Sequence, residues 1–459
     1  MVRSGAVALG FAGLRRAYAD GILAPAQSGY GPLVRDPQKV MDLPAGFSYQ
    51  VFSKFGAEMD DGLLVPGQHD GMAAFPGPGG KTILVRNHEV DPTMGKLGAF
   101  GPAYERLAKV APAKFYDYCK GNSPCAGGTT TVVYDTASGR VERQFLSLVG
   151  TLRNCAGGPT PWGSWLTCEE YVGSGGPTSE RPHGFVFEVP ARPDLAGPVD
   201  PVPLAAMGRF YREAVAVDPG SGCVYQSEDL GDGLIYRFVP KERERLAAGG
   251  TLQTLVLREY KRLDTRNWSP GPAVRPGETF DAAWVDLEDV LAPKDDLRYQ
   301  GFDKGAARFA RTEGMWFGRG AVYFCATNGG AKQKGQIWRY TPSPLEGKPQ
   351  EETKPGRLEL FLEPNDGTVL ENCDNLTVAP WGDLIVCEDE VGTGDGQQFL
   401  RGVTPEGHVY TLGRNAESAS ELAGATFSPD GTTLFVNIQT PGKTLAIRGP
   451  WKGPAGRGG

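Results

Sequence analysis

The stretch from Asn154 to Glu170 reads Asn-Cys-Ala-Gly-Gly-Pro-Thr-Pro-Trp-Gly-Ser-Trp-Leu-Thr-Cys-Glu-Glu. It begins with a polar residue and a thiol, turns at Pro161-Trp162-Gly163, and continues through a short apolar run before it ends on two carboxylates. Two short strands joined by a tight turn fit this pattern. We therefore predict a β-hairpin that carries potential metal ligands at both of its ends.

Five further segments of the chain repeat the same order of polar residue, apolar strand, turn, apolar strand and polar residue. The six turns are marked by Gly80, Gly163, Gly222, Gly320, Gly382 and Gly431. Strand side chains alternate between two faces, so a fixed offset from a tight turn places the polar residues of all copies at matching positions. Repeats of this length, with variable insertions, are typical of propeller blades. We predict an all-β fold, a six-bladed β-propeller.

The composition favours one long all-β domain. The chain has 459 residues, and its 65 glycines and 37 prolines are spread between short apolar runs rather than gathered in one tract. Such residues are expected in the turns of an all-β protein. We predict a single propeller domain over residues 27–459, with a charge-rich insertion over residues 241–300 that forms a helix and a loop on one rim.

Residues 1–26 combine an early Arg3 with an apolar stretch from Ser4 to Leu14 and small residues at Ala24-Pro25-Ala26. This order is typical of an export signal. Arg15-Arg16 follows the apolar stretch, whereas a twin-arginine signal has the pair before it. A helical or disordered N-terminal arm is the alternative interpretation of this segment.

Charge and hydropathy exclude two classes of partner. The net charge is −7, and the sequence has no Lys/Arg run long enough to follow a phosphate backbone, so we expect no stable nucleic-acid partner. It also has no apolar run of about eighteen residues, so we expect no membrane span. We expect the protein to be a monomer.

The eight cysteines leave the cellular compartment open. Cys119 and Cys125 lie in a loop of small and polar residues and would form a disulfide in an oxidising compartment. Most of the others lie in or beside predicted strands, where free thiols are commonly buried. The sequence has no Cys-x-x-Cys pair, which excludes a zinc ribbon.

If the six hairpins are the innermost strands of the blades, their leading polar residues surround one mouth of the central channel. These residues are Asp70, Cys155, Glu213, Glu313, Asp374 and Glu421. Unpaired buried charges are costly, so five carboxylates and a thiolate that converge there require bound cations. Carboxylates suit calcium, whereas a thiolate is a soft donor that calcium does not use. The set therefore indicates a transition metal, such as iron, beside calcium.

The trailing ends of the hairpins also carry acids. Glu169, Glu228 and Glu388 each follow their turn glycine by six residues, a regular offset that favours a role at the site. The adjacent acids, Glu170, Asp229 and Asp389, are equally consistent with solvated charges. Arg311 is a lone basic residue before Glu313, for which a structural ion pair is the alternative.

Several of these segments together resemble one family. They are Asn154-Cys155-Ala156, Thr160-Pro161-Trp162-Gly163, Leu166-Thr167-Cys168-Glu169-Glu170, Asn87-His88-Glu89, Gly208-Arg209-Phe210, Arg311-Thr312-Glu313, Phe427-Ser428-Pro429-Asp430-Gly431 and Phe435-Val436-Asn437-Ile438-Gln439. The chain resembles the PhoX family of alkaline phosphatases over roughly residues 35–447. The block from Asn154 to Glu170 is the most specific part of this resemblance.

The resemblance implies a metal-dependent phosphatase that hydrolyses small-molecule phosphate monoesters at a cluster of iron (Fe3+) and calcium (Ca2+) in the channel. It implies export by the twin-arginine route and a periplasmic or secreted location. Cys155 would be the thiolate ligand, with Glu169, Glu213 and Glu313 as carboxylate ligands. Arg311 would bind phosphate, and Arg311, Glu313 and Cys155 would be the catalytic residues. From their positions in the ring, we add the further ligands Asp70, Glu89, Asp374 and Glu421.

Two alternatives remain at this point. A calcium-dependent propeller hydrolase, of the lactonase or organophosphate hydrolase type, needs neither Cys155 nor Arg311. A non-catalytic binding propeller stabilised by metal would lose thermal stability without its ions but would show no turnover with them.

Overall fold

A computed structural model describes residues 29–119, 124–173, 179–268, 274–389 and 396–451. The expected export segment, residues 1–26, lies outside the described residues. The described part is built almost entirely of antiparallel β-strands, and one α-helix, α2 (Leu297–Asp303), is found in it. No helix in this part has the length and apolar character needed to cross a membrane.

The six predicted hairpins are all present as antiparallel strand pairs. In chain order they are β4 (His69–Pro76) with β5 (Thr82–His88), β8 (Asn154–Pro159) with β9 (Ser164–Glu169), β11 (Arg212–Val217) with β12 (Val224–Glu228), β16 (Thr312–Gly318) with β17 (Ala321–Ala326), β20 (Cys373–Val378) with β21 (Leu384–Glu388), and β24 (Leu422–Phe427) with β25 (Thr433–Ile438). We refer to them as hairpins one to six.

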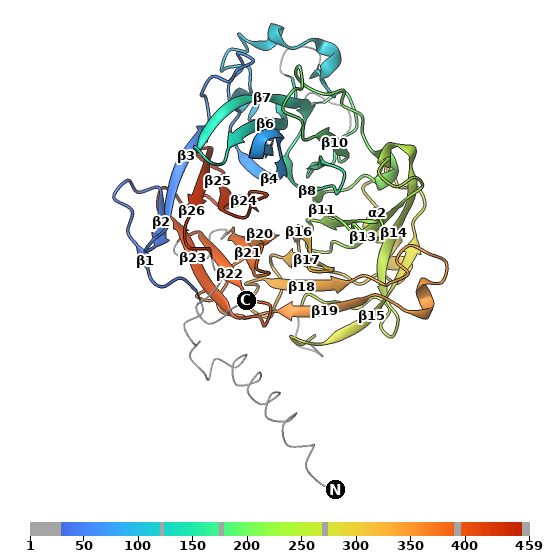
Figure 1. Cartoon of the computed structure of the whole chain (residues 1–459). Helices are drawn as coiled ribbons and strands as arrows, with labels where there is room; N and C mark the ends of the chain where they lie inside the picture. The colour runs from blue at the N-terminus through green and yellow to red at the C-terminus, as the bar shows by residue number, and fades with distance from the viewer. Residues whose placement is uncertain (1–28, 120–123, 174–178, 269–273, 390–395, 452–459) are drawn as a thin grey trace.

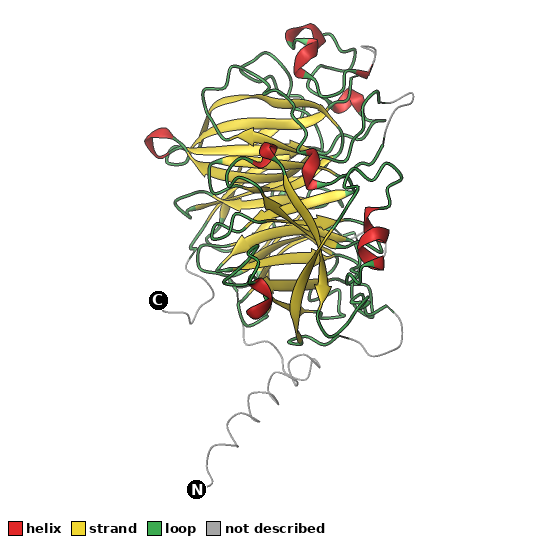
Figure 2. Cartoon of the chain, turned by 90° about the vertical axis from the view of Figure 1, so that its right-hand side faces the viewer, coloured by secondary structure: helices red, strands yellow, loops and turns green. Residues whose placement is uncertain are grey.

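The first strands of the six hairpins form the centre of the molecule. Each of β4, β8, β11, β16, β20 and β24 lies against the next in this order, and β24 lies against β4, which closes the ring. Figure 1 shows these strands in the middle, with the later strands of each group further out. The arrangement is that of a propeller, and in the side view of Figure 2 the short helices lie outside the sheets.

Outer strands complete each group. They are β6 (Gly127–Asp135), β7 (Arg140–Thr151), β10 (Val186–Pro190), β13 (Ile235–Pro240), β14 (Gly250–Leu257), β15 (Thr279–Asp286), β18 (Gln336–Thr341), β19 (Arg357–Leu362), β22 (Phe399–Val403), β23 (Val409–Asn415) and β26 (Lys443–Arg448), with the early strands β1 (Leu33–Val34), β2 (Met41–Pro44) and β3 (Ser48–Lys54). β3 pairs with β26, and β2 pairs with β23, so the N-terminal strands complete two C-terminal sheets. β15 pairs with both β14 and β19 and joins two groups into one nine-stranded sheet. The strands described therefore form five sheets, and a count of six blades stays a prediction.

The insertion predicted over residues 241–300 differs from expectation. It contains β14 and β15 as well as the start of α2, whereas we predicted only a helix and a loop. The strands form because Leu252, Leu255 and Leu257 are buried in the core, while the charged residues that suggested a rim element precede β14. Figure 1 shows α2 next to β13 and β14.

Glycines allow the inner strands to approach one another closely. A Cβ atom on Gly71 would lie 2.6 Å from the Cα atom of Ala156, and one on Gly314 would lie 2.4 Å from the carbonyl oxygen of Asp374. Neither distance is sterically possible without a backbone shift. Glycine is used in strands where another backbone comes this close, and here it brings the starts of neighbouring inner strands together.

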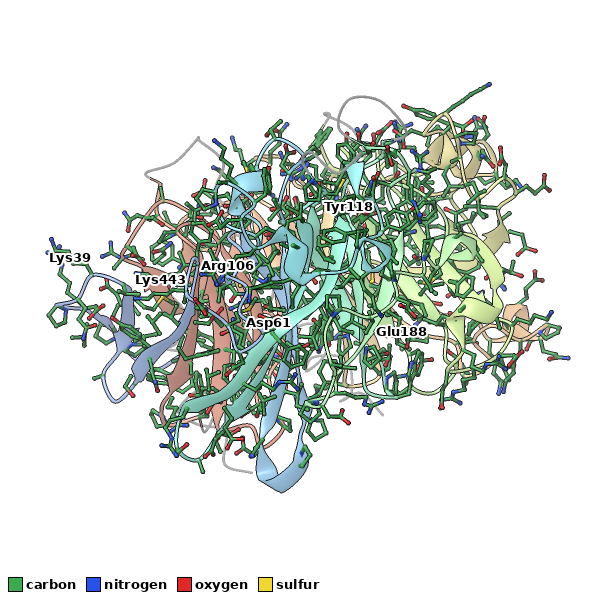
Figure 3. All side chains as sticks on the ribbon, turned by 90° about the horizontal axis from the view of Figure 1, so that it is seen from above. Lys39, Asp61, Arg106, Tyr118, Glu188 and Lys443 are labelled. Carbon is green, nitrogen blue, oxygen red and sulfur yellow. The ribbon has the colours of Figure 1, made fainter. Side chains whose placement is uncertain are left out.

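A satellite core supports the first group of strands. Met59 and Leu63, which precede β4, pack with Phe100 and Phe115, which follow β5, against Leu146 of β7. In the same region, Arg106 donates a hydrogen bond to the carbonyl oxygen of Gly62. Figure 3, seen from above, labels Asp61 and Arg106 on the ribbon of this region.

Candidate metal centre

Five candidate ligands lie in strand irregularities at the start of the inner strands. The pairing register shifts between His69 and Met72, Asn154 and Gly157, Arg212 and Val215, Thr312 and Met315, and Cys373 and Leu376. These shifts enclose Asp70, Cys155, Glu213, Glu313 and Asp374 in turn. A β-bulge redirects a side chain relative to a regular strand, so the same local irregularity recurs at each of these five residues.

The thiol of Cys155 is shared by two groups of potential ligands. One group is Asp70, Glu89 and Cys155, and the other is Cys155, Glu170 and Glu213; within each group the ligand atoms lie within 4.8 Å of one another. Donors that bind one ion at 2.0 to 2.5 Å are separated by distances of this order. Because these residues come from three consecutive hairpins, the groups assemble only when the inner strands of those hairpins pack side by side.

Three further carboxylates form the other part of the cluster. Asp374 lies within hydrogen-bonding reach of Glu313 on one side and of Glu421 on the other. Burial raises the pKa of all three groups, and the charges of neighbouring carboxylates raise it further. All three of these predicted ligands therefore belong to one cluster with oxygen donors only.

Glu169 is a predicted ligand that the structure does not bring to this cluster. Its carboxylate accepts hydrogen bonds from the backbone N–H groups of Leu152 at 3.0 Å, Gly184 at 2.9 Å and Phe185 at 3.2 Å. The Nδ1 atom of His183 lies 2.6 Å from the same carboxylate. Adjacent strand residues face opposite ways, so the next residue, Glu170, faces the cluster instead.

The same displacement by one residue occurs in two other hairpins. Glu228 accepts hydrogen bonds from the N–H group of Leu234 and the hydroxyl of Tyr236, and Glu388 accepts them from Arg401 and the N–H group of Glu371. In each case the next residue in the sequence, Asp229 or Asp389, reaches the cluster instead. Asp229 accepts a hydrogen bond from Arg311, and the charge of Asp389 raises the pKa values of Asp70 and Glu421.

Two arginines contact the cluster. Nη2 of Arg311 lies 2.9 Å from Asp229 and 2.7 Å from Glu313. Arg153 has Nη2 2.8 Å from Glu89 and 2.7 Å from Glu170. Sequence reasoning did not select Arg153, although it precedes Cys155 by the same two residues that separate Arg311 from Glu313.

Polar side chains of the second strands hold the backbone of the candidate ligands. Asn87 donates to the carbonyl oxygens of Cys155 at 3.0 Å and Ala156 at 2.7 Å, and the hydroxyl of Ser227 donates to the carbonyl oxygen of Glu313 at 2.7 Å. Asn437 donates to the carbonyl oxygen of Asp70 in the same way. Each of these contacts joins the second strand of one hairpin to the ligand of another. Buried cysteines occupy the equivalent position in the remaining hairpins, at Cys168, Cys325 and Cys387.

The donor set fits bound cations because much of its charge has no partner. Among the described residues, Glu213 Oε1, Asp229 Oδ1 and Asp374 Oδ1 are buried and have no hydrogen-bond partner. Burial raises the pKa of the Cys155 thiol, and the carboxylates of Asp70 and Glu213 raise it further. A multiply charged cation reverses both effects, because it stabilises the thiolate and the ionised carboxylates together.

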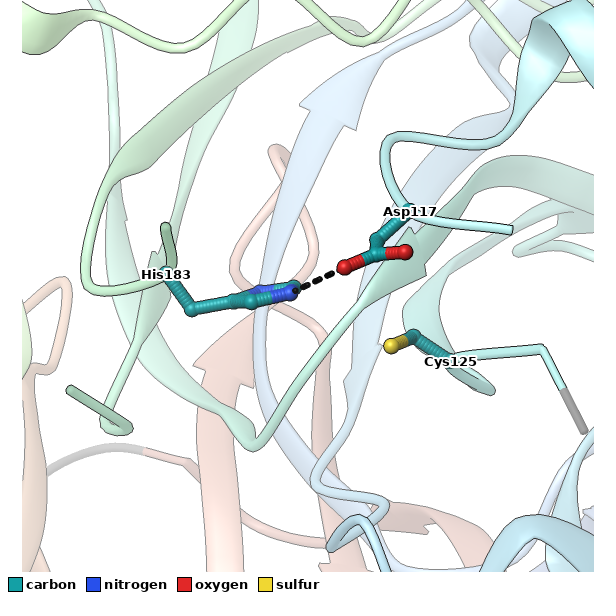
Figure 4. A group of neighbouring side chains, drawn as sticks. All are labelled: Asp117, Cys125 and His183. Atoms are coloured by element: carbon teal, nitrogen blue, oxygen red, sulfur yellow. Dashed lines mark hydrogen bonds and ion pairs between the residues drawn. The ribbon is translucent and has the colours of Figure 1, made fainter. Parts of the chain in front are cut away.

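A third group of potential ligands lies between β9 and the loop before β6. It consists of Asp117, Cys125 and His183, and Figure 4 shows the imidazole directed at the Asp117 carboxylate. Both nitrogen atoms of His183 already have partners, with Nε2 3.2 Å from Asp117 and Nδ1 2.6 Å from Glu169. Although burial lowers the pKa of His183, the charges and hydrogen bonds of these two acids raise it to about 9. This group is an ion-paired clamp rather than a metal site.

The sequence model of the family Alkaline phosphatase PhoX matches residues 28–142 and 125–442. No curated protein sequence matches the chain.

Three solved structures illustrate the range of structural similarity. The structure of Pseudomonas fluorescens PhoX in complex with vanadate, a transition state analogue, is similar with a TM-score of 0.67 and 18% identity, covering 92% of this chain and 98% of that chain. A protein of unknown function from Bacteroides thetaiotaomicron gives a TM-score of 0.42 at 10% identity, covering 88% and 76%. A gluconolactonase from Xanthomonas campestris gives 0.35 at 13% identity, covering 92% and 99%.

The likeness to the first of these structures supports the propeller fold, since the two chains match over almost their whole lengths. The family model accounts for most of the sequence independently of that likeness. The chain belongs to the PhoX family of alkaline phosphatases.

Proposed function

We propose that this protein is a metal-dependent alkaline phosphatase that hydrolyses phosphate monoesters at the mouth of the propeller channel. The observation that carries the proposal is the buried cluster around Cys155, in which carboxylates from all six hairpins and the residues that flank them converge. Arg153 and Arg311 form ion pairs with this cluster. Membership of the PhoX family supports the reaction class.

The two parts of the cluster suit two kinds of metal. Cys155 with Asp70, Glu89, Glu170 and Glu213 offers a soft donor among carboxylates, which suits iron. The second part, Glu313, Asp374 and Glu421, offers oxygen donors only, which suits calcium. Glu170 takes the place that the sequence interpretation gave to Glu169.

Bound Fe3+ and Ca2+ would supply Lewis-acid stabilisation of the phosphoryl charge and a water made acidic enough to attack at alkaline pH. The side chain of Arg311 is one-third exposed, so its guanidinium group is accessible to a substrate. It would donate hydrogen bonds to a phosphoryl oxygen. Asp229 and Glu313 hold this guanidinium in place and so reduce the entropy lost on substrate binding. Phosphoryl transfer needs mainly positioning and charge stabilisation, and these residues provide both.

The acidic net charge of −7 does not conflict with an anionic substrate. Bound cations dominate the field near their site, and the walls of a channel focus that field. We propose small-molecule phosphate esters as substrates of a monomeric enzyme. Export by the twin-arginine route to the periplasm, or secretion, is part of this proposal and rests on residues 1–26.

The proposal is tested by removing metal and restoring it. Chelated protein should not hydrolyse a chromogenic phosphate monoester, and addition of iron with calcium should restore turnover. Restoration by calcium alone, with turnover of a lactone or a phosphotriester instead, would favour the lactonase or organophosphate hydrolase alternative. Thermal stabilisation by metal without turnover of any of these substrates would indicate a binding propeller.

A further inference from the structure

Backbone hydrogen bonds identify an equivalent position in all six hairpins. In each, the N–H group of the residue that follows the second strand donates to a carbonyl oxygen just before the first strand, at 2.9 to 3.3 Å. The residues that supply this carbonyl are Gln68, Arg153, Tyr211, Arg311, Asn372 and Glu421. We call these six residues the outer ring, because they precede the strands that carry the bulged ligands.

Arg153 and Arg311 have matching surroundings within the outer ring. Both have a left-handed backbone, with φ angles of 44° and 48°, which they share with Gln68 and Asn372 of the same ring. Both pair with the acid that ends the preceding hairpin, Glu89 for Arg153 and Asp229 for Arg311. A second ion pair joins each arginine to an acid of its own hairpin. The ion pairs, rather than the shared backbone conformation, set the two arginines apart from the rest of the outer ring.

The two arginines precede the first strands of hairpins two and four, which pack on either side of the first strand of hairpin three. Hairpin three contributes Glu213 to the Cys155 part of the cluster and Asp229 to the ion pair with Arg311. The arginine side chains are equally exposed, at 32% for Arg153 and 31% for Arg311. In the described part of the chain, no acceptor contacts Nη1 of Arg153. The group that Arg153 presents to solvent therefore has donors free for a ligand.

We propose that Arg153 is a second substrate-binding residue and that the phosphoryl group is bound between Arg153 and Arg311. This inference rests on the proposed function. A phosphate monoester has three terminal oxygens, so it can accept hydrogen bonds from two guanidinium groups and still contact metal. Carboxylates already hold both guanidiniums, so substrate binding costs little side-chain entropy.

Chemical footprinting of the metal-loaded wild-type protein tests the inference without a mutation. An arginine-specific dicarbonyl reagent is applied with and without inorganic phosphate, and modification is followed by peptide mass spectrometry. Arg339 is the matched control, because its side chain is 30% exposed and pairs with Glu359 on the outer strands. Phosphate should slow modification of Arg153 and Arg311 by about fivefold or more, with the same concentration dependence, and leave Arg339 unchanged.

The outcomes separate this inference from the proposed function. Protection of Arg311 with no protection of Arg153 would overturn the inference and leave the phosphatase proposal intact. Protection of neither arginine, in a protein that also fails to hydrolyse phosphate esters, would overturn the proposed function and the inference with it.

Substitution distinguishes substrate binding from support of the ligands. Arg153→Lys keeps the charge but loses the planar fork, so KM and the inhibition constant for phosphate should both rise by about three- to tenfold. Metal content and Tm should stay at wild-type values, as they should in Arg339→Lys, which should also keep wild-type KM. An unchanged phosphate inhibition constant in a fully metallated Arg153→Lys protein would contradict the inference. If this variant loses metal, the footprinting result decides.

Discussion

Glu169 and Glu170 are neighbours in the chain, and both are buried, but their surroundings are opposite. Glu169 accepts three backbone hydrogen bonds and pairs with His183, so its charge is fully compensated within the protein. Glu170 pairs with Arg153 and otherwise faces acids, and burial together with the charge of Asp229 raises its pKa. The comparison shows that burial alone does not distinguish the two carboxylates, whereas the partners around each one do.

Removal of metal should have the largest effect on activity and stability. It should act on the carboxylate cluster that Glu170 faces and leave the Glu169–His183 ion pair unchanged. Burial, together with the charges of neighbouring acids, raises the folded-state pKa values of Asp70, Glu213, Glu313 and Asp374. Their contribution to stability is complete below the ordinary carboxylate pKa near 4 and is lost as pH rises through the raised values. Chelated protein should therefore be inactive and should have a lower Tm at pH 8 than at pH 5.

Thermal unfolding of chelated and metal-loaded protein at both pH values measures this prediction. The loaded protein should not lose Tm between pH 5 and pH 8, because cations stabilise the ionised carboxylates. Equal Tm values for chelated protein at the two pH values would contradict the account of the cluster.

Glu170→Gln and Glu169→Gln form the sharpest pair of variants. Glu170→Gln should lower metal content and reduce kcat/KM by about a hundredfold or more, with little loss of stability in the metal-free protein. Glu169→Gln should keep its metal but lose about 3 to 5 kcal/mol of unfolding free energy, because it leaves the His183 cation without one of its partners. Metal analysis and denaturant unfolding of both variants check this, and a reversed pattern would restore Glu169 as the ligand.

Cys155→Ser tests the soft donor in the cluster. The variant should remain folded and lose any thiolate-to-iron absorption band in the visible spectrum, because a hydroxyl does not provide that transition. Turnover should fall by at least about tenfold through weaker iron binding. Cys168→Ser is the control, since this thiol is buried in β9 and lies in neither ligand group around Cys155. An unchanged spectrum in an iron-containing Cys155→Ser protein would exclude the thiolate ligand.

His183→Gln removes the cation that pairs with Glu169 and Asp117. The pKa of His183 is raised to about 9, so its stabilising contribution is complete below pH 6.5 and is lost as pH rises through about 9. Each pH unit of that interval corresponds to about 1.4 kcal/mol, which gives a loss of roughly 3 kcal/mol near pH 6 and little loss near pH 10. Denaturant unfolding across this range measures the difference, and a pH-independent loss would show that the imidazolium charge is not involved.

Arg311→Ala should have the smallest effect. It should raise KM for phosphate esters and weaken phosphate inhibition by about tenfold or somewhat more, since a charge-assisted hydrogen bond contributes about 1.5 to 3 kcal/mol. The kcat value should change less than KM. Steady-state kinetics with inorganic phosphate as inhibitor provides the measurement, and equal phosphate affinity in variant and wild type would remove Arg311 from the site.

The leading ends of the hairpins were predictable from the sequence because each contains a polar residue at a regular distance from its turn. Asp70, Cys155, Glu213, Glu313 and Asp374 all reach the cluster for this reason. Their orientation depends on bulges that no sequence periodicity specifies. A bulge is defined by the pairing of two strands, and the sequence of one strand does not contain that information.

The trailing ends were less predictable because a run of two acids does not show which one faces the channel. One residue decides the face of a strand, and both the offset from the turn glycine and the family resemblance pointed to Glu169 instead of Glu170. The outer ring could not be predicted either, because it is defined by backbone hydrogen bonds. The sequence pattern grouped Glu421 with Glu313, whereas the carbonyl oxygen of Glu421 accepts the same backbone hydrogen bond as that of Arg311. The pairing of β15 with both β14 and β19 is likewise a long-range contact that the local sequence pattern does not predict.

The most direct test of the central claim is elemental analysis of purified, unchelated protein, with hydrolysis of a chromogenic phosphate monoester at alkaline pH followed on the same sample. The account predicts iron and calcium in the protein together with turnover. Calcium without iron, in a folded protein that does not hydrolyse the ester, would contradict it and would return Cys155 to the role of a buried thiol.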